Sequence, residues 1–224
     1  LQVEHPVTEL ITGLDLVELM LRVAAGEKLP LTQADVSIQG WALEARVYAE
    51  DPVRDFMPST GRLVRYRPPL ESTTVRVDTG VTEGSEVGMH YDPMMAKLVT
   101  HGADRAAAIA TMRQALDRFM VRGIQTNIPF LSALVAHSRF VEGRLSTDFI
   151  ADEYPEGFGQ ARLVPAVQQR MAALVGVVHQ CWRLREALVQ RRVPDGVLRC
   201  VRIGDARHQV VVRGADGRYS VSVD

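Results

Sequence analysis

The chain has 224 residues, of which 46% are hydrophobic and 24% charged, and its formal net charge at pH 7 is -1. This length allows one large domain or two small ones, each with its own core. The near-neutral charge gives no reason to expect nucleic acid or a membrane surface as a partner, and no apolar run approaches the roughly 20 residues that cross a bilayer.

Residues 2–9 and 44–52 each predict a strand that carries charge on one face. Successive side chains of a strand point to opposite faces, so the second run should have one polar and one apolar side. A solvated ladder of charges and a binding floor both fit such a side. The polar side holds Glu44, Arg46, Tyr48 and Glu50, and the apolar side holds Leu43, Ala45, Val47 and Ala49.

Between these runs, residues 14–25 predict a short amphipathic helix that Gly26 ends. Frequent Gly and Pro from Pro52 to Gly88 then predict short strands in an antiparallel meander. A helix over about 104–121 follows and should stop at Gly123, with apolar Ile109, Met112, Leu116 and Phe119 on one face.

Thr126 or Asn127 should cap the next helix, whose first turn tolerates Pro129 because that position has no intrahelical N–H partner. Together with the strands, these helices predict an α+β domain that extends to about residue 158.

From about 164 to 192 the sequence predicts one long helix, which needs a second surface besides its own domain. Strands are expected near 197–203, 207–213 and 218–223, with a turn at Gly214–Gly217. Such a three-stranded sheet would have an open edge, so we expect further strands to continue it. The helix has an apolar stripe of Val167, Met171, Leu174, Val178, Cys181 and Leu188.

The sequence contains five motifs in a fixed order: Gln2–Glu9, Glu44–Pro52, Phe56–Gly61, Tyr91–Leu98 and Arg122–Asn127. Together they resemble the C-terminal part of the biotin carboxylases, the ATP-grasp components of biotin-dependent carboxylases. Two further stretches, Ser138–Phe149 and Tyr154–Phe158, resemble the alpha subunits of propionyl-CoA carboxylases in particular. The resemblance covers nearly the whole chain and is most specific up to Phe158.

This resemblance implies two domains. Residues 1–158 would be the C-terminal part of the ATP-grasp domain, and residues 159–224 would begin a subunit-linking domain, in which a long helix is inserted in an antiparallel β-barrel. The implied partners are a carboxyltransferase beta subunit, bound through residues 164–224 in a hetero-oligomer, and a biotin carrier domain. The implied cofactors and substrates are biotin, ATP, Mg²⁺ and bicarbonate.

Carboxylating biotin takes a base, a cation that binds bicarbonate and a phosphorylating agent. The resemblance implies that Glu4 removes the bicarbonate proton, so that an oxygen attacks the terminal phosphate of ATP and gives carboxyphosphate. It also places the Gln2 amide and the Val3 backbone N–H on bicarbonate. Without the resemblance, Glu4 would be read as the cap of a segment that starts at Pro6.

Arg46 is the second catalytic candidate. A guanidinium stays charged and donates two parallel hydrogen bonds, which suits bicarbonate and the charge that develops on the biotin ureido oxygen. The alternative is a surface ion pair with Glu44 or Glu50, which would affect stability by about 1 kcal/mol or less.

Two loop residues have open interpretations. The resemblance places Phe56 near the biotin ring, whereas a loop phenylalanine beside a proline can also anchor its loop on a core. Asp92, between Tyr91 and Pro93, could orient Arg46 or begin a turn, and the turn is the interpretation we favour.

Several features limit what this sequence alone can do. The two lysines, Lys28 and Lys97, lack flanking methionines, so the biotinylated carrier is expected elsewhere. The histidines show no zinc or catalytic spacing. The resemblance implies that the ligands for ATP and Mg²⁺ come before Leu1. We therefore expect a fragment that is inert alone. Cys181 and Cys200 predict buried free thiols in a reducing compartment, which is the cytoplasm of a bacterium or the mitochondrial matrix of a eukaryote.

Two alternatives to this function stay open at the level of sequence. The chain could belong to an alpha subunit that acts on methylcrotonyl-CoA or acetyl-CoA, or it could be an interaction scaffold without catalysis. A scaffold has no need of Glu4 and Arg46, which favours the enzyme.

Overall fold

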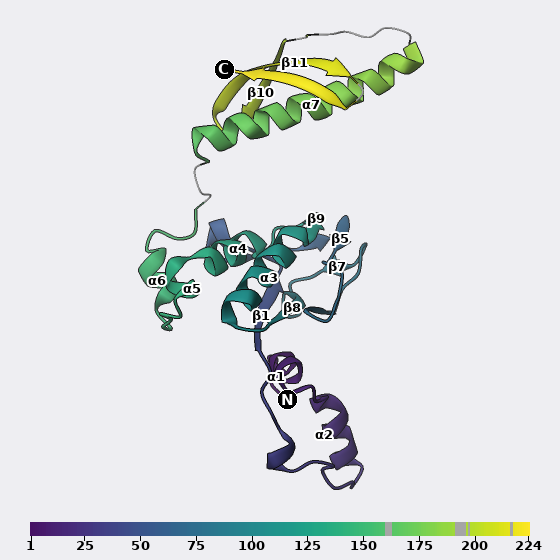
Figure 1. Ribbon diagram of the computed structural model, residues 1–224, viewed down its shortest axis with the longest axis vertical. Coiled ribbons are helices and arrows are strands. Elements are labelled where there is room, and N and C mark those ends of the chain that lie inside the picture. The colour runs from purple at the N-terminus through teal and green to yellow at the C-terminus, as the bar shows by residue number, and fades with distance from the viewer. Residues whose placement is uncertain (160–162, 191–195, 197, 216) are drawn as a thin grey trace. The chain divides into compact units, whose positions relative to one another are not determined.

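The computed structural model describes residues 1–159, 163–190, 196, 198–215 and 217–224. It divides into two compact units, Leu1–Gly159 and Gln160–Asp224, each with its own hydrophobic core. In Figure 1 the first unit runs from purple to green and the second from green to yellow.

The first unit mixes helices with short strands, which agrees with the predicted α+β class. Its helices are α1 (His5–Thr12), α2 (Leu16–Ala24), α3 (Arg105–Arg118), α4 (Ile128–Ala136), α5 (Ser138–Val141) and α6 (Phe149–Glu153), with 3₁₀ turns at Gln33–Asp35 and Pro52–Arg54. Its strands are β1 (Trp41–Tyr48), β2 (Glu50–Asp51), β3 (Met57–Pro58), β4 (Gly61–Arg62), β5 (Arg65–Arg67), β6 (Val75–Thr79), β7 (Glu86–Val87), β8 (Met94–Gly102) and β9 (Met120–Arg122).

The main sheet of this unit is antiparallel, as predicted, but it is not a meander. Its strand order is β1-β8-β6, so β8 lies between two strands that come earlier in the chain. The central place suits β8 because Leu98, Val99 and Thr100 in its middle have no exposed surface. The shorter strands pair in twos, as β2 with β3, β4 with β7 and β5 with β9.

One face of this sheet packs against α3. Ala45 and Val47 of β1 and Leu98 of β8 are buried in one cluster with Met112 and Leu116 of α3. The predicted alternation in β1 and the predicted apolar face of α3 are therefore confirmed. The polar residues of β1 consequently point to the opposite face.

Two predicted boundaries were wrong. Residues 2–9 do not form a strand: α1 begins at His5 with Glu4 at its N-cap position, and proline is accommodated in its first turn. So short a run does not separate a strand from the start of a helix. The helix α3 ends at Arg118 rather than near Gly123, because Phe119 is extended and residues 120–122 pair with β5.

The second unit consists of the long helix α7 (Pro165–Gln190) and the antiparallel strands β10 (Leu198–Ile203), β11 (Ala206–Ala215) and β12 (Arg218–Val223), in the order β10-β11-β12. The predicted helix and strands are confirmed within a few residues. The predicted helix end at Arg192, the predicted strand start at 197 and Asp216 of the predicted turn lie outside the described residues. In the described part, the sheet is open rather than a closed barrel.

The face of α7 that packs on this sheet is not the predicted apolar stripe. Ala172 and Gly176 lie against the sheet, where a Cβ on Gly176 would stand 2.6 Å from a methyl group of Val210. Such a close approach is possible only without a side chain. From the stripe, Met171, Leu174 and Val178 are 42%, 64% and 60% exposed.

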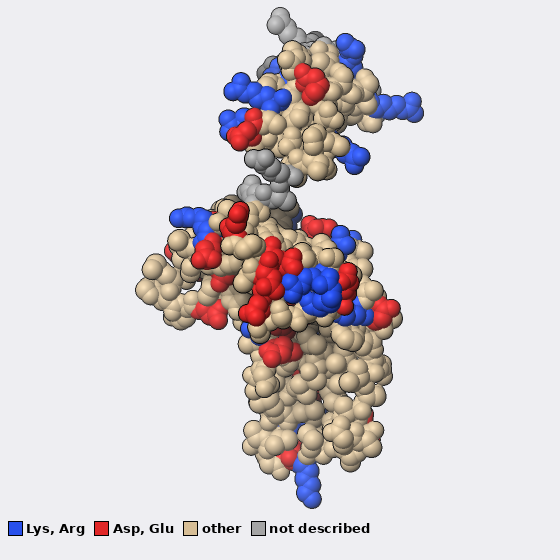
Figure 2. All heavy atoms as spheres, turned by 90° about the vertical axis from the view of Figure 1, so that its left-hand side faces the viewer, with Lys and Arg blue, Asp and Glu red and all other residues tan. Residues whose placement is uncertain are grey.

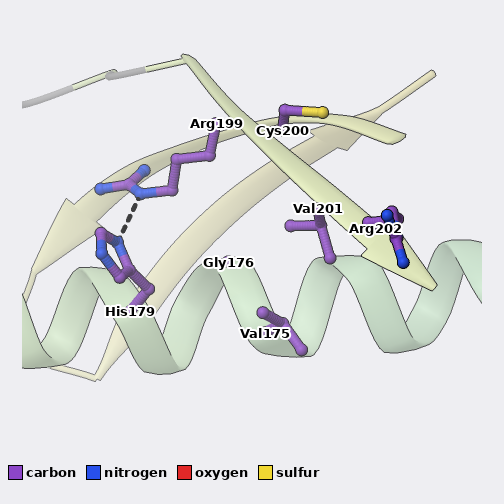
Figure 3. Close-up of a pocket in the computed structure, with 7 residues that line it drawn as sticks. All are labelled: Val175, Gly176, His179, Arg199, Cys200, Val201 and Arg202. Carbon is purple, nitrogen blue, oxygen red and sulfur yellow. Dashed lines mark hydrogen bonds between the residues drawn. The ribbon is translucent and has the colours of Figure 1, made fainter. Parts of the chain in front are cut away.

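The expectation of buried thiols was also wrong. Cys181 is half-buried, and its Sγ lies 3.3 Å from the hydroxyl of Tyr219, while Cys200 is exposed. Strand alternation explains the exposure, because Val201 next to Cys200 takes the position that faces α7 (Figure 3).

Candidate functional site

Charged side chains lie in register across the face of the main sheet that is opposite α3. Arg46 of β1 pairs with Lys97 of β8, and Lys97 pairs with Asp78 of β6. We call these three residues the charged row. Aligned cross-strand neighbours are close enough for their side chains to interact. The Lys97 Nζ lies 3.2 Å from Asp78 Oδ2.

The segment before α1 and α1 itself lie on this charged face. Arg46 Nη2 donates to Glu4 Oε2 at 3.0 Å, and Lys97 Nζ donates to the Val3 carbonyl at 3.2 Å. Arg76, which is next but one to Asp78 on β6, donates to Glu9 Oε2 at 2.6 Å. The structure therefore brings Arg46 to the segment of Val3 and Glu4, although Arg46 comes 42 residues after Glu4 in the sequence.

Figure 2 shows acidic and basic side chains in contact on one face of the first unit. The part of this unit that contains α1 and α2 is mostly uncharged in the same view. An apolar groove of about 730 Å³ lies there, lined by residues such as Leu16, Met20 and Val23 of α2 and by Gln2.

Arg46 is held from several sides but is not buried. Its side chain is 40% exposed, and its Nε lies 3.6 Å from Glu44 Oε1. Burial lowers the pKa of the guanidinium, but Tyr48, Glu44 and Glu4 outweigh this, and the pKa lies above its usual value. A permanently charged group with exposed N–H donors can bind an anion.

Glu44 is the buried acid of this site. Its side chain is 6% exposed, and its Oε2 has no hydrogen-bond partner among the residues that the structure describes. Burial raises the pKa of this carboxyl, while Lys97 and Arg46 act in the opposite direction. Glu44 therefore helps to hold the two cations at the cost of its own desolvation.

The remaining predicted bicarbonate ligand, Gln2, is exposed and lies one turn before α1. Its carbonyl accepts from His5 Nδ1 at 3.0 Å. Val3 presents its carbonyl to Lys97. Roles for Gln2 and Val3 on bicarbonate stay predictions.

Phe56 packs among aromatic side chains. Its ring packs edge-on against Phe130 with centroids 4.9 Å apart, and Phe130 also contacts Tyr154 and Phe158. This contact supports the loop-anchor interpretation, and a role of Phe56 on biotin stays a prediction. The turn predicted at Asp92 is confirmed, because Asp92 Oδ1 accepts from Met94 N at 2.8 Å.

Sequence reasoning missed Lys97 and Asn127 as parts of this site. Lys97 is the charged residue in the otherwise apolar middle of β8, which was the available signal. Asn127 was predicted as a helix cap, yet its side chain contacts β1. Without the fold, neither Lys97 nor Asn127 could be linked to the site around Arg46.

In the second unit, a groove of about 500 Å³ lies between α7 and β10. Figure 3 shows Arg199 pointing toward His179, and its Nε donates to His179 Nδ1 at 2.9 Å. The described residues hold no group of three His, Cys, Asp or Glu side chains that could bind a metal ion. No described helix combines the length and the apolar character needed to span a bilayer.

Comparisons with known proteins agree on one family. Residues 44–152 match the family model of the biotin carboxylase C-terminal domain, and residues 1–32 match the ATP-binding domain of the carbamoyl-phosphate synthase L chain. The propionyl-CoA carboxylase alpha chain of Ruegeria pomeroyi is 49% identical, over 100% of this chain and 35% of its own length.

Two further similarities extend this result. The mitochondrial methylcrotonoyl-CoA carboxylase subunit alpha of Rattus norvegicus is 51% identical over 70% of this chain and 22% of its own length. A crystal structure of the biotin carboxylase domain dimer of Hydrogenobacter thermophilus 2-oxoglutarate carboxylase, in complex with MgADP, ADP and bicarbonate, has a TM-score of 0.68. It is 38% identical and covers 72% of this chain and 35% of its own. The chain thus spans about a third or less of these relatives.

Proposed function

We propose that this chain, which belongs to the biotin carboxylase family, supplies part of the site that carboxylates carrier-bound biotin with bicarbonate and ATP. The observation that carries the proposal is the contact of Glu4 with Arg46 at 3.0 Å on the charged face of the sheet. It joins a candidate base to a candidate anion-binding cation, which are the two groups that the chemistry requires of this chain.

In this proposal Arg46 binds bicarbonate and stabilises negative charge on the biotin ureido oxygen. Its side chain is exposed enough to reach both. Glu4, which is 59% exposed, takes the bicarbonate proton. Lys97 adds a second positive charge behind Arg46 and holds the Val3 carbonyl, so that the segment with Glu4 keeps its place.

Biotin, when attached to its carrier, supplies the nitrogen that accepts the carboxyl group. ATP and Mg²⁺ activate bicarbonate, and we assign their ligands to parts of the full-length protein that this chain does not span, because the chain covers about a third of the length of its relatives. The isolated chain should therefore show no bicarbonate-dependent ATP hydrolysis.

The test of the site is Arg46→Ala in the full-length carboxylase. Loss of one preorganised donor typically costs about a hundredfold to a thousandfold in rate, so biotin carboxylation should fall by at least about a hundredfold while the protein stays folded. Arg144→Ala is the matched control, because Arg144 also forms an exposed ion pair, with Glu142 at 2.7 Å. Near wild-type carboxylation by the Arg46→Ala variant would instead favour the alternative that the chain is an interaction scaffold without catalysis.

As the substrate of the whole enzyme we propose propionyl-CoA, which would be converted to methylmalonyl-CoA. The similarity to propionyl-CoA carboxylase alpha chains over the full chain supports this choice. The similarity to a methylcrotonoyl-CoA carboxylase subunit covers 70% of the chain and keeps that substrate, and acetyl-CoA, as alternatives. Rates of the purified holoenzyme with these three acyl-CoA substrates would decide among them.

We assign residues 159–224 to the subunit-linking domain, with a carboxyltransferase beta subunit as the partner of residues 164–224 in a hetero-oligomer. The support is the exposed apolar side of α7, where Leu174, Val178 and Trp182 are 64%, 60% and 65% exposed. Apolar side chains gathered on one side of a helix mark an interaction surface. We further propose a bacterial cytoplasm or a mitochondrial matrix as the compartment, since both cysteines are free thiols.

Leu174→Glu in the full-length protein tests this partner. Burying a leucine is worth about 1.5 to 3 kcal/mol, so a charge there should remove the beta subunit in co-purification, while ATP hydrolysis dependent on free biotin persists. Gln169→Glu places the same charge at another exposed position of α7 and should keep the complex. An intact complex with Leu174→Glu would rule out this contact.

A further inference from the structure

The side chain of Asn127 contacts the backbone on either side of Val47. Its Oδ1 accepts from the Tyr48 N–H at 2.9 Å, and its Nδ2 donates to the Arg46 carbonyl at 3.0 Å. The backbone N–H of Asn127 donates to the Tyr48 carbonyl at 3.2 Å. Asn127 is 6% exposed, so water does not compete for these bonds.

These bonds let one side-chain amide take the place of a neighbouring strand. β1 is an edge strand of the main sheet, and its outer edge would otherwise leave the Arg46 carbonyl and the Tyr48 N–H without a strand partner. In a longer sheet, a backbone N–H and a backbone C=O of an adjacent strand would bind the same two atoms. The pairing of β1 with β8 shifts its register between Val47 and Tyr48. The bonds from Asn127 to Arg46 and Tyr48, which we call the Asn127 clamp, therefore act at the irregular point of β1.

Asn127 does not use its side chain as a helix cap. It occupies the N-cap position of α4, where an asparagine usually accepts a hydrogen bond from the first turn, but it makes no such bond here. Its amide is directed to β1 instead. A purely structural cap has no reason to forgo that bond.

We propose that Asn127 is a positioning residue for Arg46. This inference rests on the function proposed above and names a residue through which the site is held in place. By fixing the carbonyl of Arg46 and both polar backbone atoms of Tyr48, Asn127 sets the point from which the guanidinium extends. Tyr48 also neighbours that guanidinium, so the clamp holds two sides of the same group.

The test combines substitutions at Asn127 and Arg46 in the full-length carboxylase. Asn127→Ala removes both side-chain bonds, and a displacement of about 1 Å in an active site can cost about a hundredfold, so kcat/KM for bicarbonate should fall by about tenfold to a hundredfold. The KM for ATP should change by less than about twofold, because its ligands lie elsewhere. In an Arg46→Ala background, the same change should cost less than about twofold.

Asn127→Asp keeps the acceptor for the Tyr48 N–H but turns an oxygen toward the Arg46 carbonyl, and it should reproduce the loss. If Asn127→Ala does not fold, Asn127→Asp replaces it in the double-mutant cycle with Arg46→Ala. The matched control is Asp104→Ala, which removes a side-chain cap on the Ala107 N–H of α3. It should leave kcat/KM for bicarbonate and KM for ATP unchanged.

Two outcomes separate this inference from the function on which it rests. Equal losses from Asn127→Ala in the wild-type and Arg46→Ala backgrounds would overturn the positioning role, while leaving the function of Arg46 intact. Wild-type activity in Arg46→Ala itself would instead overturn the proposed function. Unchanged kinetics in folded Asn127→Ala would also reject the inference.

Discussion

The sheet β1-β8-β6 and the sheet β10-β11-β12 are both antiparallel and three-stranded, and each packs one face on a helix. They differ in their other face. In the first sheet this face carries paired charges that bind the segment around α1. In the second sheet it exposes residues of different kinds, namely Cys200, Arg202, Arg207, Gln209, Arg213 and Ser220.

The strand residues therefore have different roles in the two units. In the first unit, alternate residues of β1 belong either to the core or to the candidate site, so fold and site share one strand. In the second unit, the sheet serves mainly to hold α7, and the apolar side of that helix remains exposed. We therefore expect the first unit to depend on a large core and a charge network, and the second on one close helix-to-sheet approach.

The largest effect should come from the core of the first unit. Leu98 is fully buried in β8, and truncation of such a residue leaves a cavity, so Leu98→Ala should lower the local stability by about 3 to 5 kcal/mol. Hydrogen exchange of the β8 amides measures this loss. Leu174→Ala, at an exposed leucine of the other unit, should change exchange by less than about 0.5 kcal/mol. Similar effects of Leu98→Ala and Leu174→Ala would contradict the expectation that the first unit depends on its large core.

The next effect should be confined to the second unit. A leucine in place of Gly176 cannot fit, because a Cβ there would already stand 2.6 Å from Val210 and 3.0 Å from Val212. Overpacking of this kind costs about 1 to 3 kcal/mol, so Gly176→Leu should speed hydrogen exchange in β11. Exchange in β8 should not change. Val178→Leu, at an exposed position of the same helix, is the control and should have no effect on β11.

These regions also differ in how far the sequence predicted them. The elements of the second unit follow from local patterns, since the change from a helical period to a period of two marks where α7 ends and the strands begin. The wrong stripe on α7 has a physical reason: a close approach requires small residues, and Ala172 and Gly176 carry no hydrophobic signal.

In the first unit, the sequence identified Glu4 and Arg46 as candidates and the apolar side of β1. It did not identify Lys97 or Asn127, whose partners are fixed by strand register and by bonds that span 79 and 81 positions along the chain. Local propensity has no information about such pairs.

A third prediction concerns the charge network and its dependence on pH. Burial raises the pKa of Asp78, but hydrogen bonds from Arg76 and Lys97 outweigh it, and the pKa lies below its usual value. A lowered pKa in the folded state means that the carboxylate stabilises the fold above its unfolded pKa, and that this contribution is lost as pH falls through the folded pKa. Asp78→Asn should therefore cost about 1 to 2 kcal/mol at pH 7.

The cost of Asp78→Asn should shrink as the pH is lowered below about 4, where the wild-type carboxylate takes up its proton. Thermal unfolding of both proteins across this range measures the difference. A deficit that stays constant with pH would mean that the charge of Asp78 contributes nothing beyond the shape of its side chain.

The smallest effect is expected for a pair that looks as good by distance alone. Arg22 and Glu18 of α2 approach to 2.5 Å, closer than Lys97 and Asp78 at 3.2 Å, but their side chains are 47% and 54% exposed, against 13% and 28% for Lys97 and Asp78. Water solvates both partners in the unfolded and folded states, so an i,i+4 pair of this kind contributes about 0.3 to 0.5 kcal/mol. A double-mutant cycle on Arg22→Ala and Glu18→Ala, followed by thermal unfolding at low and high salt, measures the coupling. A coupling energy above about 1 kcal/mol would show that distance, and not burial, sets the strength of ion pairs in this unit. The exposed pair of Arg22 and Glu18 would then stabilise the fold as much as the less exposed Asp78 does.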